Sequence, residues 1–166
     1  MLKRVRIENF RAIKELDTEV GPITVLYGEN DAGKSSLFYA LYVLKNLLSN
    51  PNRRIDDLFN LTFINLGGFE QVVHKHDLSS TINILVEVID GNHSIAYGVE
   101  ISRDGCRFGL AFANAQFLLQ AALPYPANQQ QRLPCDEDEF GEHAIEGAEI
   151  IWNGLVAQVI LSSKVV

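Results

Sequence analysis

Residues 28–36 read Gly-Glu-Asn-Asp-Ala-Gly-Lys-Ser-Ser, and their setting constrains the fold more than any other segment of the chain. They follow an apolar, β-rich run at residues 23–27 and precede a stretch in which leucine and alanine recur every three or four positions. The first pattern predicts a buried strand, and the second predicts a helix with one apolar face. We therefore expect a strand, a glycine-containing loop and a helix, in that order, over residues 23–49.

The loop has the composition of a phosphate-binding site, Gly-x-x-x-x-Gly-Lys-Ser. Gly28 and Gly33 permit backbone conformations in which successive N–H groups point at one anion. The helix that follows adds the positive end of its dipole, Lys34 can reach β and γ phosphates, and the Ser35 hydroxyl suits Mg²⁺. We predict that the loop binds a nucleoside triphosphate with Mg²⁺. The alternative is a glycine turn beside an incidental lysine.

Composition limits the class of protein. The chain has 166 residues, 47% of them hydrophobic, with a net charge of −7. We expect one globular domain over residues 1–166 that folds without a disulfide or a metal. No apolar run approaches the ~18 residues that a membrane-spanning helix needs, and no charged-then-apolar leader opens the chain, so we expect a cytoplasmic protein. Cys106 and Cys135 fit neither a zinc knuckle nor a disulfide framework, and we propose neither as a nucleophile.

Charge is unevenly distributed along the chain. Residues 136–149 hold seven acidic side chains and no Lys or Arg, whereas residues 1–14 hold five basic side chains against Glu8 alone. We interpret the acidic run at residues 136–139 as a solvated loop and not as a two-metal nuclease site. The overall acidity argues against a broad DNA-coating surface, although a local basic patch is compatible with it. That basic patch would consist of Lys3, Arg4, Arg6 and Lys14. We favour the alternative that these side chains pair with neighbouring carboxylates and do not contact DNA.

Strand patterns dominate outside the helix. Turn residues such as Asp-Gly and Asn-Gly separate several of them, which favours hairpins. The candidate strands are residues 2–7, 16–20, 81–89, 93–101, 106–113, 149–152 and 155–161. We predict an antiparallel meander over about 81–161, with a short helix at 114–122, and leave residues 58–73 unassigned. The fold class is therefore α/β, a P-loop NTPase lobe with a mixed sheet, an antiparallel β-meander subsheet and a P-loop helix.

Three motifs in the first 48 residues also carry a family likeness: LKRVRIENFRAI, LDTEV and GENDAGKSS. A strand, then Asn-Phe-Arg, a second short strand and a Gly-x-Asn-x-x-Gly-Lys-Ser loop open the ABC-type ATPase heads of the SMC, RecF and OLD-nuclease group, which this chain resembles. The resemblance implies an AAA-type ATP-binding protein, with this chain as the N-terminal lobe of a longer ATPase. It further implies a homodimer of heads that sandwiches ATP in DNA repair, chromosome maintenance or nuclease control, with DNA or a nuclease as a partner.

The resemblance assigns roles to individual residues. Arg11, which follows Asn9-Phe10, would approach the nucleotide phosphates, and a glutamine after the antiparallel strands would reach the metal or the attacking water. Gln116 is the best placed, and Gln71 and Gln120 compete with it. The alternative for each glutamine is a polar residue on a helix face, and the alternative for Arg11 is a solvated surface charge. We expect Mg²⁺ to be bound by Ser35 and Gln116. The expected ATP-binding residues are Gly28, Glu29, Asn30, Asp31, Ala32, Gly33, Lys34, Ser35, Ser36 and Arg11.

Catalytic elements of that group have no counterpart in the sequence. A Walker B segment needs four apolar residues followed by Asp-Glu, and the nearest string ends at Asp90, a hairpin-turn residue with no glutamate after it. Residues 161–164 lack the glycines of a signature loop. We therefore expect no catalytic residue here and leave ATPase activity open. The alternative is a non-hydrolysing nucleotide-sensing or protein-interaction module; a small-molecule kinase fits less well, because such enzymes continue into a parallel core.

A histidine pair, His74 and His76, stands beside Asp77. The spacing would place two imidazoles on one strand face, but no third metal ligand is evident. We predict that these are surface histidines next to a turn.

Overall fold

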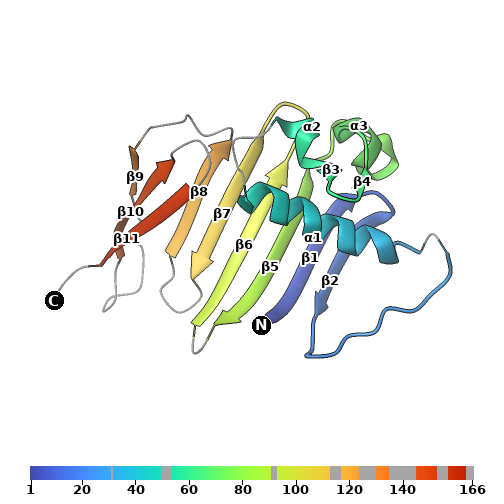
Figure 1. The fold of residues 1–166 in the computed structure, drawn as a ribbon, viewed down its shortest axis with the longest axis horizontal. Helices are drawn as coiled ribbons and strands as arrows, with labels where there is room; N and C mark the ends of the chain where they lie inside the picture. The colour runs from blue at the N-terminus through green and yellow to red at the C-terminus, as the bar shows by residue number, and fades with distance from the viewer. Residues whose placement is uncertain are drawn as a thin grey trace.

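The computed structural model describes residues 1–30, 32–49, 54–90, 93–112, 117–123, 130–134, 145–152 and 157–163. Its centre is a six-stranded sheet in the order β2-β1-β5-β6-β7-β8, in which every neighbouring pair is antiparallel (Figure 1). The strands are β1 (Leu2–Phe10), β2 (Ile13–Glu19), β5 (Ile82–Asp90), β6 (His93–Ile101), β7 (Cys106–Phe112) and β8 (Phe117–Leu123).

One helix, α1 (Lys34–Ser49), lies across one face of this sheet (Figure 1). It buries Ala40, Val43, Leu44 and Leu47, which recur at helical spacing, and it contacts β1 and β5. On β1 the buried residues Val5 and Ile7 alternate with Arg4 and Arg6, so that the charged side chains lie on the opposite face of the sheet. The apolar side of α1 packs against the apolar face of the sheet, and this contact forms the core.

Short elements between α1 and β5 extend this core. They are α2 (Ile55–Leu58), β3 (Asn60–Leu61), β4 (Ile64–Asn65), α3 (Phe69–Val72) and the 3₁₀ turn η1 (His74–His76). They lie at the end of the sheet where β1 ends and β5 begins (Figure 1). Phe59, Phe69 and Val72 are buried there, so residues 58–73, which the sequence left unassigned, supply part of the core.

The apolar run at residues 23–27 does not form the predicted strand. This segment is outside every sheet of the described residues, and Ile23, Val25 and Tyr27 are 88%, 78% and 93% exposed. A strand exists only where a neighbour satisfies its N–H and C=O groups, and no described strand pairs with this one. The predicted helix is confirmed, since α1 begins at Lys34 and ends at Ser49.

The predicted meander is confirmed for β5, β6 and β7, which pair in sequence order. The helix predicted at 114–122 is wrong in its described part, because residues 117–123 form β8 and pair with the edge of β7. The later strands form a separate sheet in the order β11-β10-β9, so the meander is not continuous. These strands are β9 (Gln130–Pro134), β10 (Ile145–Trp152) and β11 (Ala157–Ser163).

The fold is therefore mixed α/β, and its described strands form antiparallel sheets. The expected mixed sheet is not found, because all the pairings of the described strands are antiparallel. Within the described ranges, no helix combines the length and the apolarity needed to cross a bilayer.

Candidate functional site

The glycine-containing loop curls around the ammonium group of Lys34. Lys34 Nζ donates hydrogen bonds to the carbonyl oxygens of Gly28 at 2.8 Å and Glu29 at 2.5 Å. Gly28 has φ +149° and Gly33 has φ +88°, which are conformations that residues with a Cβ adopt rarely. The two glycines of the motif therefore occupy positions where the bend of the loop requires them.

The first turn of α1 presents its two serines differently. Ser35 is exposed, whereas Ser36 is buried. The helix begins at Lys34, and the N–H of Leu37 donates to the carbonyl oxygen of Gly33 at 3.1 Å. Ser35 is thus the more exposed of the two serines at the positive end of the helix dipole, while Ser36 is turned away from solvent.

The turn between β1 and β2 abuts the loop. A Cβ added at Gly33 would lie 3.4 Å from Ile13 Cγ1 and 3.7 Å from Ala12 Cβ. The guanidinium carbon of Arg11 lies 5.5 Å from the centre of the Tyr39 ring. Because Tyr39 follows Ser35 by four residues on α1, the two side chains share one face of the helix. The structure therefore brings Arg11 close to the start of α1, although the two lie far apart in sequence.

The Asn-Phe-Arg motif forms an unusual turn at the end of β1. Asn9 and Arg11 have φ values of +55° and +52°, and Phe10 between them is fully buried. Phe10 forms an isolated antiparallel bridge with Val73, and the His74 ring nitrogen Nδ1 lies 2.8 Å from the carbonyl oxygen of Arg11. The prediction of a surface histidine is thus only partly right, since His74 is half-buried; nothing in the sequence signals a contact across 63 residues.

The predicted metal ligands are only partly within the described structure. Gln116 lies outside the described residues, as does Asp31 of the loop. Gln71 is engaged locally, because its Oε1 accepts a hydrogen bond from the N–H of Gly68 at 2.9 Å, and Gln120 lies in β8. In the part of the chain that the structure describes, no group of three or more His, Cys, Asp or Glu residues is arranged to hold a metal ion.

The remaining loop residues lie at the surface. Glu29, Asn30 and Ala32 are exposed, and the N–H of Ala32 donates to the carbonyl oxygen of Glu29 at 3.3 Å. These three residues therefore lie on the solvent-facing side of the loop.

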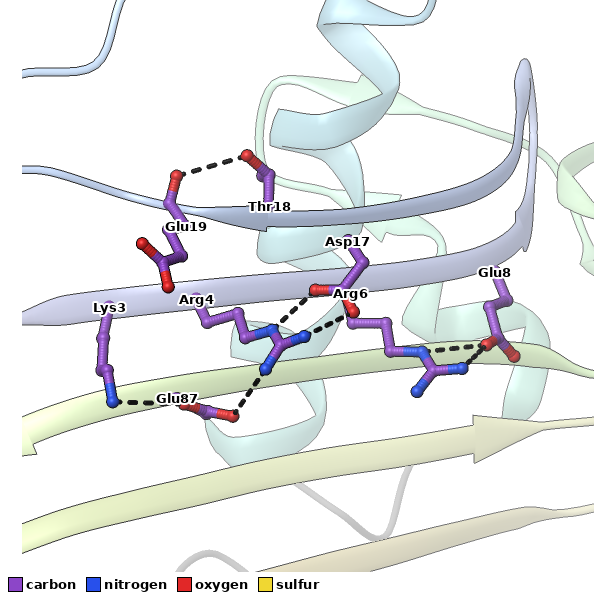
Figure 2. A network of polar contacts seen from close by, with 8 residues as sticks. All are labelled: Lys3, Arg4, Arg6, Glu8, Asp17, Thr18, Glu19 and Glu87. Carbon is purple, nitrogen blue, oxygen red and sulfur yellow. Dashed lines mark hydrogen bonds and ion pairs between the residues drawn. The ribbon is translucent and has the colours of Figure 1, made fainter.

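The basic side chains of β1 are paired with carboxylates (Figure 2). Arg4 donates two hydrogen bonds to the Asp17 carboxylate, both of 2.7 Å, and the pKa of Asp17 is lowered, chiefly by these bonds. Arg6 Nη2 lies 2.6 Å from Glu8 Oε1, and Lys3 Nζ lies 4.0 Å from Glu87 Oε2. This arrangement agrees with the alternative that the N-terminal basic residues balance neighbouring acids.

Comparison with known proteins adds two findings. The OLD nuclease of Thermus scotoductus is 42% identical to this chain over 41 residues, which are 25% of this chain and 8% of the nuclease. The matched part is therefore a small share of that relative's length. A family model described as an AAA ATPase domain matches residues 1–133, which include the loop, α1 and the Arg11 turn. On this match over most of its length, the chain belongs to the AAA ATPase domain family.

Proposed function

We propose that the chain binds Mg·ATP through residues 28–36 and Arg11, as the ATP-binding lobe of an SMC/RecF/OLD-like ATPase. The observation that carries this proposal is the position of Lys34, whose ammonium is surrounded by a loop bent at two positive-φ glycines, at the start of a 16-residue helix. Phosphate oxygens are charged acceptors and form stronger hydrogen bonds with an ammonium than the carbonyls of Gly28 and Glu29 do.

The residues around the loop fit both Mg²⁺ and the phosphate groups of ATP. The Ser35 hydroxyl, at the start of α1, offers Mg²⁺ an oxygen ligand, which is the type this cation prefers. Arg11 offers phosphate a planar set of donors from the neighbouring turn. Bound Mg²⁺ would neutralise part of the phosphate charge, and Gln116 stays the proposed second ligand.

The work of the complete ATPase is also part of the proposal. Two such heads would close over ATP and act in DNA repair, chromosome maintenance or nuclease control, and the similarity to an OLD nuclease favours the last of these. A second candidate, a non-hydrolysing nucleotide-sensing or protein-interaction module, is supported by the exposed apolar residues Ile23, Val25 and Tyr27.

ATP hydrolysis is the activity in which this lobe alone is expected to differ from the complete enzyme. The sequence holds no Walker B acid and no signature loop to stabilise the transferring phosphoryl group. We propose that this chain alone binds ATP without turning it over. Release of phosphate at about 1 per second or faster, abolished by Lys34→Ala, would contradict this.

Calorimetric titration with Mg·ATP tests the binding site. Lys34→Ala is expected to weaken binding by about 1.5 to 3 kcal/mol, through loss of charged hydrogen bonds. Lys45→Ala is the matched control, because Lys45 lies on the same helix, 5.7 Å from the centre of the Tyr42 ring, and should leave the affinity unchanged. Equal affinities for the parent chain and Lys34→Ala would refute the assignment.

A further inference from the structure

Both main-chain polar groups of Arg11 are bonded to one distant segment. The Arg11 N–H donates to the carbonyl oxygen of Val72 at 2.7 Å, and the Arg11 carbonyl oxygen lies 2.8 Å from His74 Nδ1. Between these contacts, Phe10 pairs with Val73. Arg11 has φ +52°, a left-handed conformation that costs energy for a residue with a Cβ. Residues 72–74 therefore hold the turn in a conformation that it would not favour alone.

The His74 bond determines where the proton of the imidazole lies. A carbonyl oxygen only accepts hydrogen bonds, so Nδ1 must carry the hydrogen and act as the donor. His74 is half-buried, which reduces competition from water for this bond. The bond reaches the main chain of Arg11 and leaves the guanidinium group available for other contacts.

The backbone of Arg11 determines where its side chain starts. From this turn the guanidinium reaches Tyr39, one helical turn beyond Ser35, and the turn itself abuts Gly33. A change in the φ and ψ angles at residue 11 would redirect the side chain away from Tyr39 and this end of α1. His74 thus contacts the main chain of the turn that abuts Gly33, and none of the contacts that the structure describes joins His74 to the loop itself.

We propose that His74 is a positioning residue for nucleotide binding, because its Nδ1–H bond to the Arg11 carbonyl holds the turn from which the Arg11 guanidinium reaches Tyr39, on the face of α1 that Ser35 shares. This inference rests on the proposed function. ATP affinity is then expected to depend on His74 only as long as residue 11 is an arginine.

A double-mutant cycle in Mg·ATP affinity tests this claim. His74→Leu removes the donor and is expected to weaken binding about twofold to tenfold, the range of one lost hydrogen bond. In the Arg11→Ala background, His74→Leu should cause no further loss. His74→Asn, whose side-chain N–H can take the place of the Nδ1–H donor, should restore affinity to within about twofold of the parent.

The melting temperature of each variant is measured alongside, because a purely structural role would lower it without producing coupling in affinity. If His74→Leu does not fold, His74→Met, which also lacks a donor, takes its place in the same cycle. Parent affinity in the donor-free variant, or a loss as large in the Arg11→Ala background as in the parent background, would overturn the proposal for His74. Binding that is absent in the parent chain, or unaffected by Lys34→Ala, would overturn the proposed function instead.

Discussion

Asn9 donates a hydrogen bond from Nδ2 to the carbonyl oxygen of Thr81 at 2.9 Å, and this bond joins the end of β1 to the residue before β5. Asn9 has φ +55°, a conformation that asparagine tolerates better than most residues with a side chain. The bond stabilises the bend after which Phe10 enters the core and Arg11 turns toward α1. The first residue of the Asn-Phe-Arg motif therefore has a structural role that needs no ligand.

Replacing Asn9 tests this role. Asn9→Ala loses the hydrogen bond and places a less tolerant residue at positive φ, so we expect the free energy of unfolding to fall by about 1 to 3 kcal/mol. Asn9→Gly loses the same bond without the steric strain and should lose less. Urea unfolding measures both variants. An alanine variant as stable as the parent would contradict the role that we assign to Asn9.

The pH dependence of stability should include a contribution from Glu8. Its pKa is lowered, first by the hydrogen bond from Asn83 and then by Arg6. A lowered pKa in the folded state contributes stability that is fully present above the unfolded value of about 4.3 and is lost as the pH falls through the folded pKa. Glu8→Gln should therefore be less sensitive to acid than the parent between about pH 5 and pH 2. Denaturant unfolding at several pH values checks this, and identical pH profiles would count against it.

The Cys106 thiol should be unreactive in the folded protein. It is 5% exposed, and burial raises its pKa to about 12. Since the thiolate is the reactive form, we expect no labelling by Ellman's reagent at about pH 8 under native conditions and full labelling in denaturant. The measurement uses Cys135→Ser, so that Cys106 is the one cysteine left. Rapid labelling of the native variant would show that the thiol is accessible.

The ion pairs on β1 lead to a prediction about DNA. Because Lys3, Arg4 and Arg6 lie beside carboxylates, Lys3→Ala/Arg4→Ala/Arg6→Ala should bind duplex DNA no more weakly than the parent. Binding is measured across salt concentrations, with Lys45→Ala as a control on α1. A patch that did bind, with Lys14 included, would give a slope of log affinity against log salt no steeper than about −4. A loss of DNA affinity in the triple variant but not in Lys45→Ala would show that the basic patch binds DNA and would contradict this prediction.

Features that depend on neighbouring residues could be predicted from the sequence. The positive-φ glycines at 28 and 33 and the helix from Lys34 to Ser49 follow from local steric preference and helical periodicity. The hairpins of β5, β6 and β7 likewise join strands next to each other in sequence, across turns whose residues tolerate tight bends. For these elements the contacts that matter lie within a few residues or across one turn.

Strand pairing and long-range hydrogen bonds were decided only by the tertiary structure, because they depend on partner residues that a local sequence pattern does not identify. Residues 23–27 have the composition of a strand but no strand partner among the described residues. Residues 117–123, for which we predicted a helix, form a strand because they pair with the edge of β7. The main chain of Arg11, whose guanidinium lies over Tyr39 of α1, is hydrogen-bonded to Val72 and His74, about sixty residues away. The sequence determined the shape of the loop, and the packing of distant segments determined which side chains surround it.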